Sequence, residues 1–253
     1  MPCVCKHTQI LPPSPLFFVI YNGNNMNDSF KTMKIFLDTA DTQAIRDGYE
    51  TGLIDGVTTN PTLIMKSGRN PKEVLTEIAD IFPWSSSISA EVVADTTEGM
   101  LEIADDFLNI NQNITIKVPC TVDGLKTCKE LSSDDISVNV TLIFTQSQAI
   151  LAAKAGAQYV SPFVGRVDDN SFGGLCLIKD IANVYAKQKV EKTNILAASL
   201  RNVRDVGRAF EYGANVVTMP PNVFWGMYNH ILTEKGLALF DADWKKVQSH
   251  EEV

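Results

Sequence analysis

The stretch ITIKVPCT, Ile114 to Thr121, decides how the rest of the chain is interpreted. Its run of Ile, Thr, Ile and Val is typical of a buried strand, which Pro119 would close. Lys117 lies inside this apolar run. A lysine is almost never fully buried unless it has a partner or a function. The stretch therefore predicts a core strand that carries a functional ammonium group near its end.

Short apolar strands and helical patterns alternate on both sides of this stretch. We expect strands at residues 34–39, 55–61, 88–93, 114–119, 136–144, 158–164, 194–199 and 215–220. Helical patterns lie between them, for example at residues 95–110, 145–157 and 202–214. Such alternation pairs the strands in parallel, and eight units in one chain of this size predict a single (β/α)8 TIM barrel. An open doubly wound sheet is the alternative, but the GxGxxG turn that usually follows its first strand is missing from this sequence.

The predicted barrel domain covers residues 33–253 and ends in an additional helix. That helix contains the apolar residues Leu237, Leu239, Phe240 and Trp244, and a terminal helix of this kind often packs on a neighbouring subunit. Residues 1–32 precede the pattern, and three prolines interrupt their apolar part. A signal peptide needs an uninterrupted apolar stretch. We therefore expect a flexible N-terminal extension, and no segment of the sequence has the length and hydrophobicity of a membrane span.

Charge and cysteine usage narrow the class of protein further. The 253 residues carry a net charge of −8, which argues against sequence-independent binding to nucleic acid. A local cluster of cations could still bind a small anionic substrate. The five cysteines form no pair of CxxC motifs, so neither a disulfide framework nor a zinc site is predicted. Two glycosylation sequons lie inside expected strands, at Asn113 and Asn139. Both observations indicate a reducing, cytoplasmic compartment.

Polar residues interrupt the expected strands near their carboxyl ends, where the active site of a TIM barrel lies. These residues are Asp38, Thr58, Asn60, Glu91, Lys117, Asn139, Thr141, Ser161, Ser199 and, just beyond strand ends, Arg166 and Arg201. Singly, each has a structural explanation: Asp38 could cap a helix, Asn60 could belong to a turn, and Glu91 could pair with Lys117. A core that needed only stability would use Val, Ile and Leu at all of these positions, so together they predict a site.

The residue types fit one chemistry. Lys117 is the only lysine that we place inside a strand, and burial disfavours the charged form of a lysine. A neutral amine can attack a carbonyl and form a Schiff base, which then withdraws electrons from an adjacent carbon–carbon bond. Asp38 is the candidate for moving the proton of the departing hydroxyl. Glu91 with Thr141 could hold the water that forms and hydrolyses the imine.

Other residues would bind the substrate. Arg166, helped by Ser199 and Arg201, could hold a phosphate through charge-assisted, forked hydrogen bonds. The three histidines, His7, His230 and His250, lie outside the expected strands, which argues against a histidine-based triad or a three-histidine metal site. Walker and HExxH motifs do not occur in the sequence.

At this point the motifs resemble those of one family. FLDTAD, GVTTNPTL, ISAEVV, ITIKVPCTVDGLK, NVTLIFTQSQAILAAKAGAQYVSPFVGRVDD and AASLRNVRDV are similar to the transaldolase family, and most of all to its small branch, which also includes fructose-6-phosphate aldolases. The resemblance runs from about Met33 to the C-terminal helix. It implies a (β/α)8 barrel, a Schiff-base lysine at Lys117, and no metal or organic cofactor. It also implies a pentamer or a pair of pentamers.

The resemblance assigns further roles residue by residue. It implies proton transfer by Asp38 and a water held by Glu91 and Thr141. Positions that it matches to substrate or phosphate binding are Thr58, Asn60, Asn139, Ser161, Phe163, Arg166, Ser199 and Arg201.

Three functions remain open at this stage. The first is transaldolase, which moves a dihydroxyacetone unit between sugar phosphates in the pentose phosphate pathway. The second is an aldolase that releases free dihydroxyacetone, and the third is a phosphosugar-binding barrel without catalysis. A barrel that only binds a phosphosugar would not need catalytic residues, yet Asp38, Glu91 and Lys117 are all present. Their presence argues against the third function. The aldolases of the small branch resemble this chain but carry Gln in place of Glu91 and Tyr in place of Phe163, and both differences favour transfer.

Overall fold

A computed structural model of the chain describes residues 33–82 and 86–251. The expected N-terminal extension, residues 1–32, lies outside the described residues, as do Cys3, Cys5 and His7. Among the helices of the described ranges, none is long and apolar enough to cross a membrane.

Eight parallel strands form a closed barrel in which every strand pairs with its neighbours in sequence and β8 pairs with β1. The strands are β1 Lys34–Asp38, β2 Gly56–Thr58, β3 Ser87–Glu91, β4 Ile114–Pro119, β5 Val138–Ile143, β6 Tyr159–Pro162, β7 Asn194–Ala197 and β8 Val216–Met219. This confirms the TIM barrel expected from the sequence. Each strand begins and ends within two residues of its expected bounds, except β2, whose expected range, 55–61, runs three residues further and reaches the first residue of α2.

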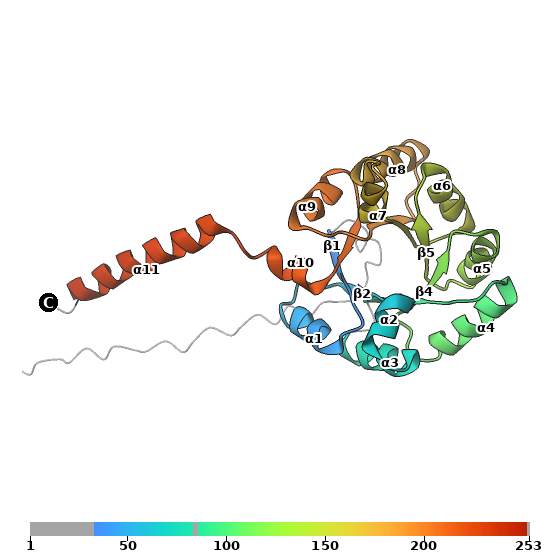
Figure 1. Ribbon diagram of the computed structural model, residues 1–253, viewed down its shortest axis with the longest axis horizontal. Coiled ribbons are helices and arrows are strands. Elements are labelled where there is room, and N and C mark those ends of the chain that lie inside the picture. The colour runs from blue at the N-terminus through green and yellow to red at the C-terminus, as the bar shows by residue number, and fades with distance from the viewer. Residues whose placement is uncertain (1–32, 83–85, 252–253) are drawn as a thin grey trace, which may run out of the picture. The chain divides into compact units, whose positions relative to one another are not determined.

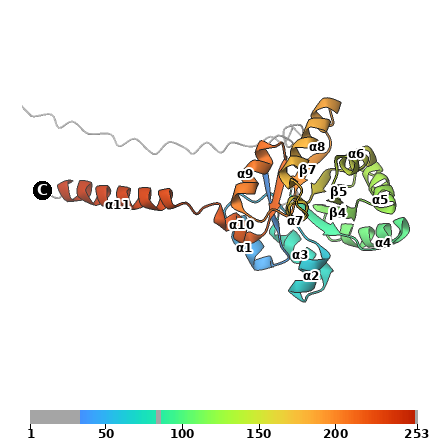
Figure 2. The same cartoon turned by 45° about the horizontal axis from the view of Figure 1, so that its top comes forward.

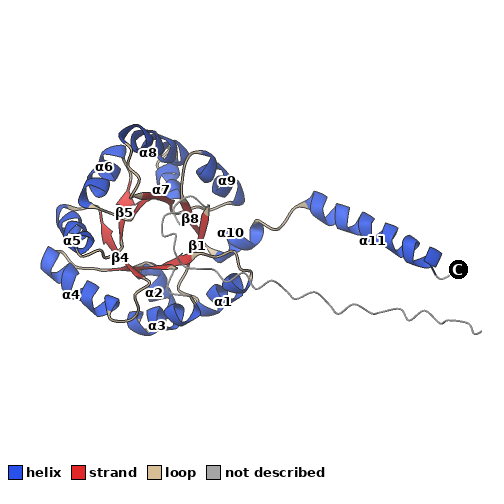
Figure 3. Ribbon diagram, turned by 180° about the vertical axis from the view of Figure 1, so that it is seen from behind, coloured by secondary structure: helices blue, strands red, loops and turns tan. Residues whose placement is uncertain are grey.

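Helices cover the outside of the barrel (Figures 1 and 3). They are α1 Thr42–Glu50, α2 Pro61–Ser67, α3 Pro71–Ile81, α4 Thr97–Leu108, α5 Val122–Ser133, α6 Gln146–Ala155, α7 Val164–Asp169, α8 Gly174–Gln188, α9 Val203–Glu211 and α10 Pro221–Gly226. The last helix, α11 Ile231–Glu251, is not one of these covering helices. In the tilted view of Figure 2 the barrel helices again lie outside the strands. The helix expected at the C-terminal end of the sequence is α11.

The core lies between the strands and these helices. Apolar residues of the strands, such as Val57, Ile116 and Val140, pack with helix residues such as Ile78 and Ile178, and all five are fully buried. The barrel interior is different, because many of its buried side chains are polar. Ser89, Asn139, Ser161 and Thr218 are among them. Burying polar groups is costly unless they are hydrogen-bonded, so a polar interior indicates a site rather than simple packing.

Helix caps fix the points where the chain turns from strand to helix at the carboxyl end of the barrel. Asp41, Asn60, Thr96, Thr121 and Thr145 each accept a hydrogen bond from a backbone N–H of the helix that follows. Asp41 rather than Asp38 therefore caps α1, which leaves Asp38 free of the structural role considered for it. Asn60 does cap α2, through a 3.0 Å bond from the Leu63 N–H.

Candidate active site

Side chains from six of the eight strands or the segments after them line a cavity of about 110 Å³ at the carboxyl end of the barrel. The lining residues are Asp38, Thr58, Asn60, Lys117, Ser161, Phe163, Arg166, Ala198, Ser199 and Thr218. Eight of these ten residues were predicted as site residues from the sequence. The structure therefore brings together residues that lie up to 180 positions apart in the chain, between Asp38 and Thr218.

Lys117 is buried, with 4% of its surface exposed. Its ammonium group lies 3.0 Å from Glu91 Oε2 and donates a 3.1 Å hydrogen bond to the backbone carbonyl of Thr59. Glu91 and Lys117 are register partners on β3 and β4, so the backbone pairing itself sets their distance. The statement that Lys117 is the only strand lysine is wrong, because Lys34 begins β1. Lys34 is only partly buried and lies at the opposite, amino end of its strand.

Asp38 ends β1 and accepts a 2.8 Å hydrogen bond from the Thr58 hydroxyl. That hydroxyl also lies 2.7 Å from the hydroxyl of Thr218 on β8. Burial raises the pKa of Asp38 above its ordinary value; the charge of Lys117 and the bond from Thr58 oppose this rise, and the charge of Glu91 adds to it. Asp38 is therefore a carboxyl group that takes up a proton more readily than an exposed aspartate.

A hydrogen-bonded row crosses the floor of the site. The Asn139 amide donates to the Ser89 hydroxyl over 3.1 Å, and the Asn139 carbonyl accepts from the Ser161 hydroxyl over 2.7 Å. Both groups of the Asn139 side chain thus have partners inside the protein. The buried Thr141 hydroxyl, in contrast, has no hydrogen-bond partner in the described part of the chain. A buried polar group without a partner is typical of a position where a water or a substrate group is bound.

Two aromatic rings and an arginine stack at the mouth of the cavity. The Phe163 ring packs edge-on against Phe144, with centroids 5.9 Å apart, and the Arg166 guanidinium lies 5.1 Å from the Phe163 centroid. Strand alternation predicts that Ser161 and Phe163 share a face, and both do line the cavity. The phenyl ring therefore forms part of the wall beside Lys117 and holds Arg166 by a cation–π contact.

Ser199 follows β7 in the left-handed backbone region, with φ of 59°. A residue other than glycine in this conformation is strained, and such residues cluster at functional sites. The Ser199 carbonyl accepts a 3.1 Å hydrogen bond from the Gly165 N–H, which ties the start of α7 to the end of β7. Arg166 is therefore held at the cavity through the backbone of the neighbouring strand.

Arg201 differs from the expectation that it lines the site with Ser199. It does not line the 110 Å³ cavity, and its guanidinium forms a forked ion pair with Asp169 at the end of α7. Glu91 also lies apart from the lining residues: it borders a neighbouring apolar hollow of about 350 Å³ that includes Thr59, Asn60 and Val93. Glu91 nonetheless contacts Lys117 directly.

Sequence reasoning missed three residues of this region. Thr218 and Ala198 line the cavity, and Asp169 binds Arg201. Thr218 could have been found, because it is a polar residue within the apolar run VVTM. Ala198 carries no chemical signal, and the pairing of Asp169 with Arg201 spans 32 residues.

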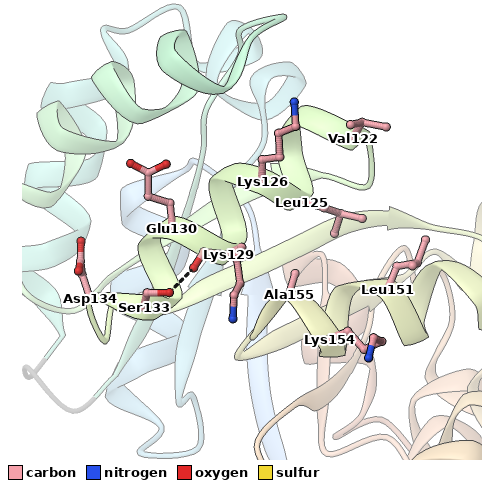
Figure 4. Close-up of a pocket in the computed structure, with 10 residues that line it drawn as sticks. All are labelled: Val122, Leu125, Lys126, Lys129, Glu130, Ser133, Asp134, Leu151, Lys154 and Ala155. Atoms are coloured by element: carbon pink, nitrogen blue, oxygen red, sulfur yellow. Dashed lines mark hydrogen bonds between the residues drawn. The ribbon is translucent and has the colours of Figure 1, made fainter.

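The largest of the hollows lies elsewhere, on the outside of the barrel between α5 and α6 (Figure 4). It measures about 740 Å³ and is lined by apolar residues together with Lys126, Lys129 and Lys154. In Figure 4 the ammonium groups of Lys126 and Lys129 point away from each other, so the lysines do not converge on one anion. Its lining includes none of the polar site residues at the strand ends. Within residues 33–82 and 86–251, no group of three His, Cys, Asp or Glu side chains could hold a metal ion.

The chain is similar in sequence to proteins of one family. A sequence model of the family described as transaldolase/fructose-6-phosphate aldolase matches residues 35–251. A protein of Paracoccus denitrificans, named probable transaldolase, is 52% identical over 214 residues, which cover 85% of this chain and 97% of that protein. Proteins with the same name from Caulobacter vibrioides and Sphingopyxis alaskensis are similar at 52% identity over 212 residues (84% of this chain, 96% of that protein) and 53% over 214 residues (85% and 98%).

Proposed function

Because the chain belongs to the transaldolase/fructose-6-phosphate aldolase family, we propose that it is a transaldolase that works through a Schiff base on Lys117. The reaction moves a dihydroxyacetone unit from a ketose phosphate to an aldose phosphate. Its physiological form would convert sedoheptulose 7-phosphate and glyceraldehyde 3-phosphate into erythrose 4-phosphate and fructose 6-phosphate. The observation that carries this proposal is the buried ammonium group of Lys117, which lies beside the carboxyl groups of Glu91 and Asp38.

The first half of the reaction forms the imine. The Lys117 amine must lose a proton before it can attack, and Glu91, 3.0 Å away, is placed to accept it. The amine nitrogen then adds to the ketose carbonyl carbon, and loss of the former carbonyl oxygen as water leaves an iminium. Glu91 and the free hydroxyl of Thr141 would hold that water.

The second half breaks and remakes a carbon–carbon bond. Asp38 takes the proton of the hydroxyl on C4, two carbons from the iminium carbon. The C3–C4 bond then breaks, C4 leaves as the aldehyde of an aldose phosphate, and the electrons of the broken bond move into the iminium to give an enamine. The raised pKa of Asp38 favours this uptake. The same carboxyl group would return the proton to the acceptor's oxygen when the enamine attacks a second aldose. Water then hydrolyses the iminium and frees Lys117.

The phosphate of the substrate would bind at Arg166 and Ser199, with Arg201 nearby. Phosphate is recognised well by the planar fork of an arginine. Asn60, Asn139 and Ser161 would contact substrate hydroxyls.

Borohydride trapping tests the mechanism. Incubation with fructose 6-phosphate and borohydride should reduce the imine, inactivate the enzyme and add a three-carbon or six-carbon adduct to Lys117 that peptide mass spectrometry can locate. A Lys117→Met variant should gain no adduct. An adduct on a different lysine, or a fully active Lys117→Met variant, would contradict the proposal.

The second candidate, an aldolase that releases free dihydroxyacetone, is favoured by the family's name, which covers both activities. Phe163 argues for transfer, because a phenyl ring in the cavity wall can neither donate a proton to the enamine nor orient water. The two candidates are distinguished by supplying fructose 6-phosphate with and without erythrose 4-phosphate. A transaldolase forms product only when the acceptor is present.

We further infer a homo-oligomer in the cytoplasm. All of the described thiols are free, namely Cys120, Cys128 and Cys176, which suits a reducing compartment. Helix α11 exposes large apolar side chains that a second subunit could cover.

A further inference from the structure

The guanidinium group of Arg201 is held from one side by Asp169. Nη1 of Arg201 donates to one carboxylate oxygen of Asp169 and Nη2 donates to the other. Both side chains are about half exposed, at 53% and 51%. Exposed ion pairs contribute little to stability, so this pair is not explained by the folding of the domain. A forked pair does fix the plane and direction of a guanidinium group.

The Nε atom of the same guanidinium lies on the side of Gly165 and Ser199. A Cβ atom built on Gly165 would lie 2.7 Å from Arg201 Nε and 3.1 Å from the Ser199 hydroxyl oxygen. Arg201 Nε therefore lies across Gly165 next to Ser199, which lines the cavity. Within the described ranges Nε makes no hydrogen bond. The Nε edge of Arg201 is thus available to a ligand at Ser199, while the Nη edge is occupied.

Asp169 is placed to act on both arginines of this region. It lies three residues after Arg166 on α7, and residues with this spacing share a helix face. Hydrogen bonds from Arg201 hold the pKa of Asp169 below its ordinary value, and the charges of Arg201 and Arg166 lower it further. The carboxylate is therefore charged at neutral pH, and it can keep its hold on Arg201 during turnover.

We propose that Asp169 is a positioning residue, which orders Arg201 so that its Nε edge, together with Arg166 and Ser199, binds the phosphate of the substrate. This inference rests on the proposed function, since it assumes a phosphorylated substrate. Ordering an arginine beforehand removes part of the entropic cost that binding otherwise carries. Asp169 also repels the phosphate, so its net effect on affinity combines two opposite contributions.

A pair of variants separates these contributions. Asp169→Asn and Asp169→Ala remove the same negative charge, but the asparagine keeps one oxygen that can accept from Arg201. The dissociation constant for inorganic phosphate, measured by isothermal titration calorimetry, should be about 3- to 10-fold higher in Asp169→Ala than in Asp169→Asn, the range expected for losing one pre-ordered side chain. The same ratio should appear in KM for fructose 6-phosphate, with kcat for an unphosphorylated acceptor similar in the two variants.

Arg201 supplies the decisive control. In an Arg201→Ala background the two Asp169 variants should bind phosphate equally, because the group that Asp169 orders is gone. Equal binding by the two variants with Arg201 present, or a difference that persists without Arg201, would overturn the inference. The proposed function fails independently, if Lys117 forms no trapped imine in the unmodified enzyme, because the calorimetric measurement requires no turnover.

Discussion

At the scale of single residues, Asp38 combines a catalytic position with an energetic cost. Its carboxyl group is buried beside Lys117, yet burial outweighs that favourable charge and raises its pKa. A group whose pKa is raised in the folded state binds its proton more tightly there than in the unfolded chain. Its stabilising contribution is therefore complete below the unfolded-state pKa and is lost as the pH rises through the folded-state pKa. Above its folded-state pKa, the ionised Asp38 therefore destabilises the fold.

We expect Asp38→Asn to lower kcat and to raise thermal stability at pH 7. Losing a general acid and base typically costs about 10²- to 10⁴-fold in rate, while a neutral amide removes the cost of burying a charge. The gain in Tm over the unmodified protein should shrink as the pH falls through the folded-state pKa of Asp38, because its carboxyl group then takes up a proton. Calorimetric scans at pH 7 and at successively lower pH values check this. Asp47→Asn, at an exposed aspartate on α1, is the control and should leave Tm and kcat unchanged. A lower Tm for Asp38→Asn at pH 7 would contradict the argument.

Phe163 decides between transfer and release in our interpretation. Phe163→Tyr should raise the release of free dihydroxyacetone from fructose 6-phosphate and lower the transfer rate, because the new hydroxyl can orient water or donate a proton near the enamine. Coupled assays with and without acceptor measure both rates. Phe144→Tyr is the matched control, since Phe144 contacts Phe163 but does not line the cavity. If the unmodified enzyme already releases dihydroxyacetone as fast as it transfers it, Phe163 has only a packing role and does not control the choice between transfer and release.

At the scale of elements, the contact between α7 and the end of β7 positions the phosphate-binding arginines. Gly165 is required there for lack of space: a Cβ atom would lie 2.4 Å from the Ser199 carbonyl oxygen and 2.7 Å from Arg201 Nε. Atoms this close must move apart, and one of them belongs to backbone that is already in the left-handed conformation. A change at Gly165 therefore displaces Arg166, Ser199 and Arg201 together.

Gly165→Ala should raise KM for phosphorylated substrates by at least tenfold and destabilise the protein by about 1–3 kcal/mol, the usual cost of overpacking. Steady-state kinetics and urea unfolding measure the two effects. Gly207→Ala on α9 is the control: no atom lies within 4 Å of the added Cβ, and alanine favours a helix. That variant should keep its KM and its stability or gain slightly. A Gly165→Ala enzyme with unchanged KM and stability would show that α7 can shift without weakening substrate binding or the fold.

The elements were predictable from the sequence to different degrees for physical reasons. The strands alternate with helices at a regular spacing and end in capping residues such as Asn60 and Thr145, so their order and ends follow from local pattern. Leu142 adopts φ of 58° where the register between β5 and β6 shifts, and a leucine gives no sign of that. Helix α7 has only six residues and no side-chain cap, so it was not recognised as a helix.

The candidate site was predictable wherever a polar residue interrupts an apolar strand. Lys117, Asp38, Ser161 and Ser199 were found in this way, and all line the cavity. The pairing of Arg201 with Asp169 could not be predicted in this way. Asp169 ends a short helix among other charged residues, and only the closed barrel brings it close to Arg201. Long-range pairing of exposed charges has no signature in local sequence.

At the scale of the whole molecule, the apolar surface of α11 lacks cover within the described chain. Leu237, Phe240, Trp244 and Val247 follow one another at intervals of three or four residues, which places them on one helix face. Their exposures range from 46% to 69%. Fully burying one such side chain contributes about 1.5–3 kcal/mol. A stripe of four therefore favours the association that we proposed for this chain.

We therefore expect Phe240→Glu and Trp244→Glu to reduce the mass of the particle in solution, as measured by size-exclusion chromatography with light scattering. Each places a charge in the middle of the apolar stripe, where association would have to desolvate it. Ala242→Glu adds the same charge at an exposed position of α11 that lies about 200° around the helix from Phe240, at about 100° per residue, and it should leave the mass unchanged. The barrel itself does not need α11 for its core, because none of residues 231–249, the part of α11 whose burial is described, is buried. The two stripe variants should consequently keep the circular-dichroism spectrum of a folded barrel while they dissociate. A monomeric unmodified protein, or equal masses for all three variants, would show that α11 is not the contact that joins subunits.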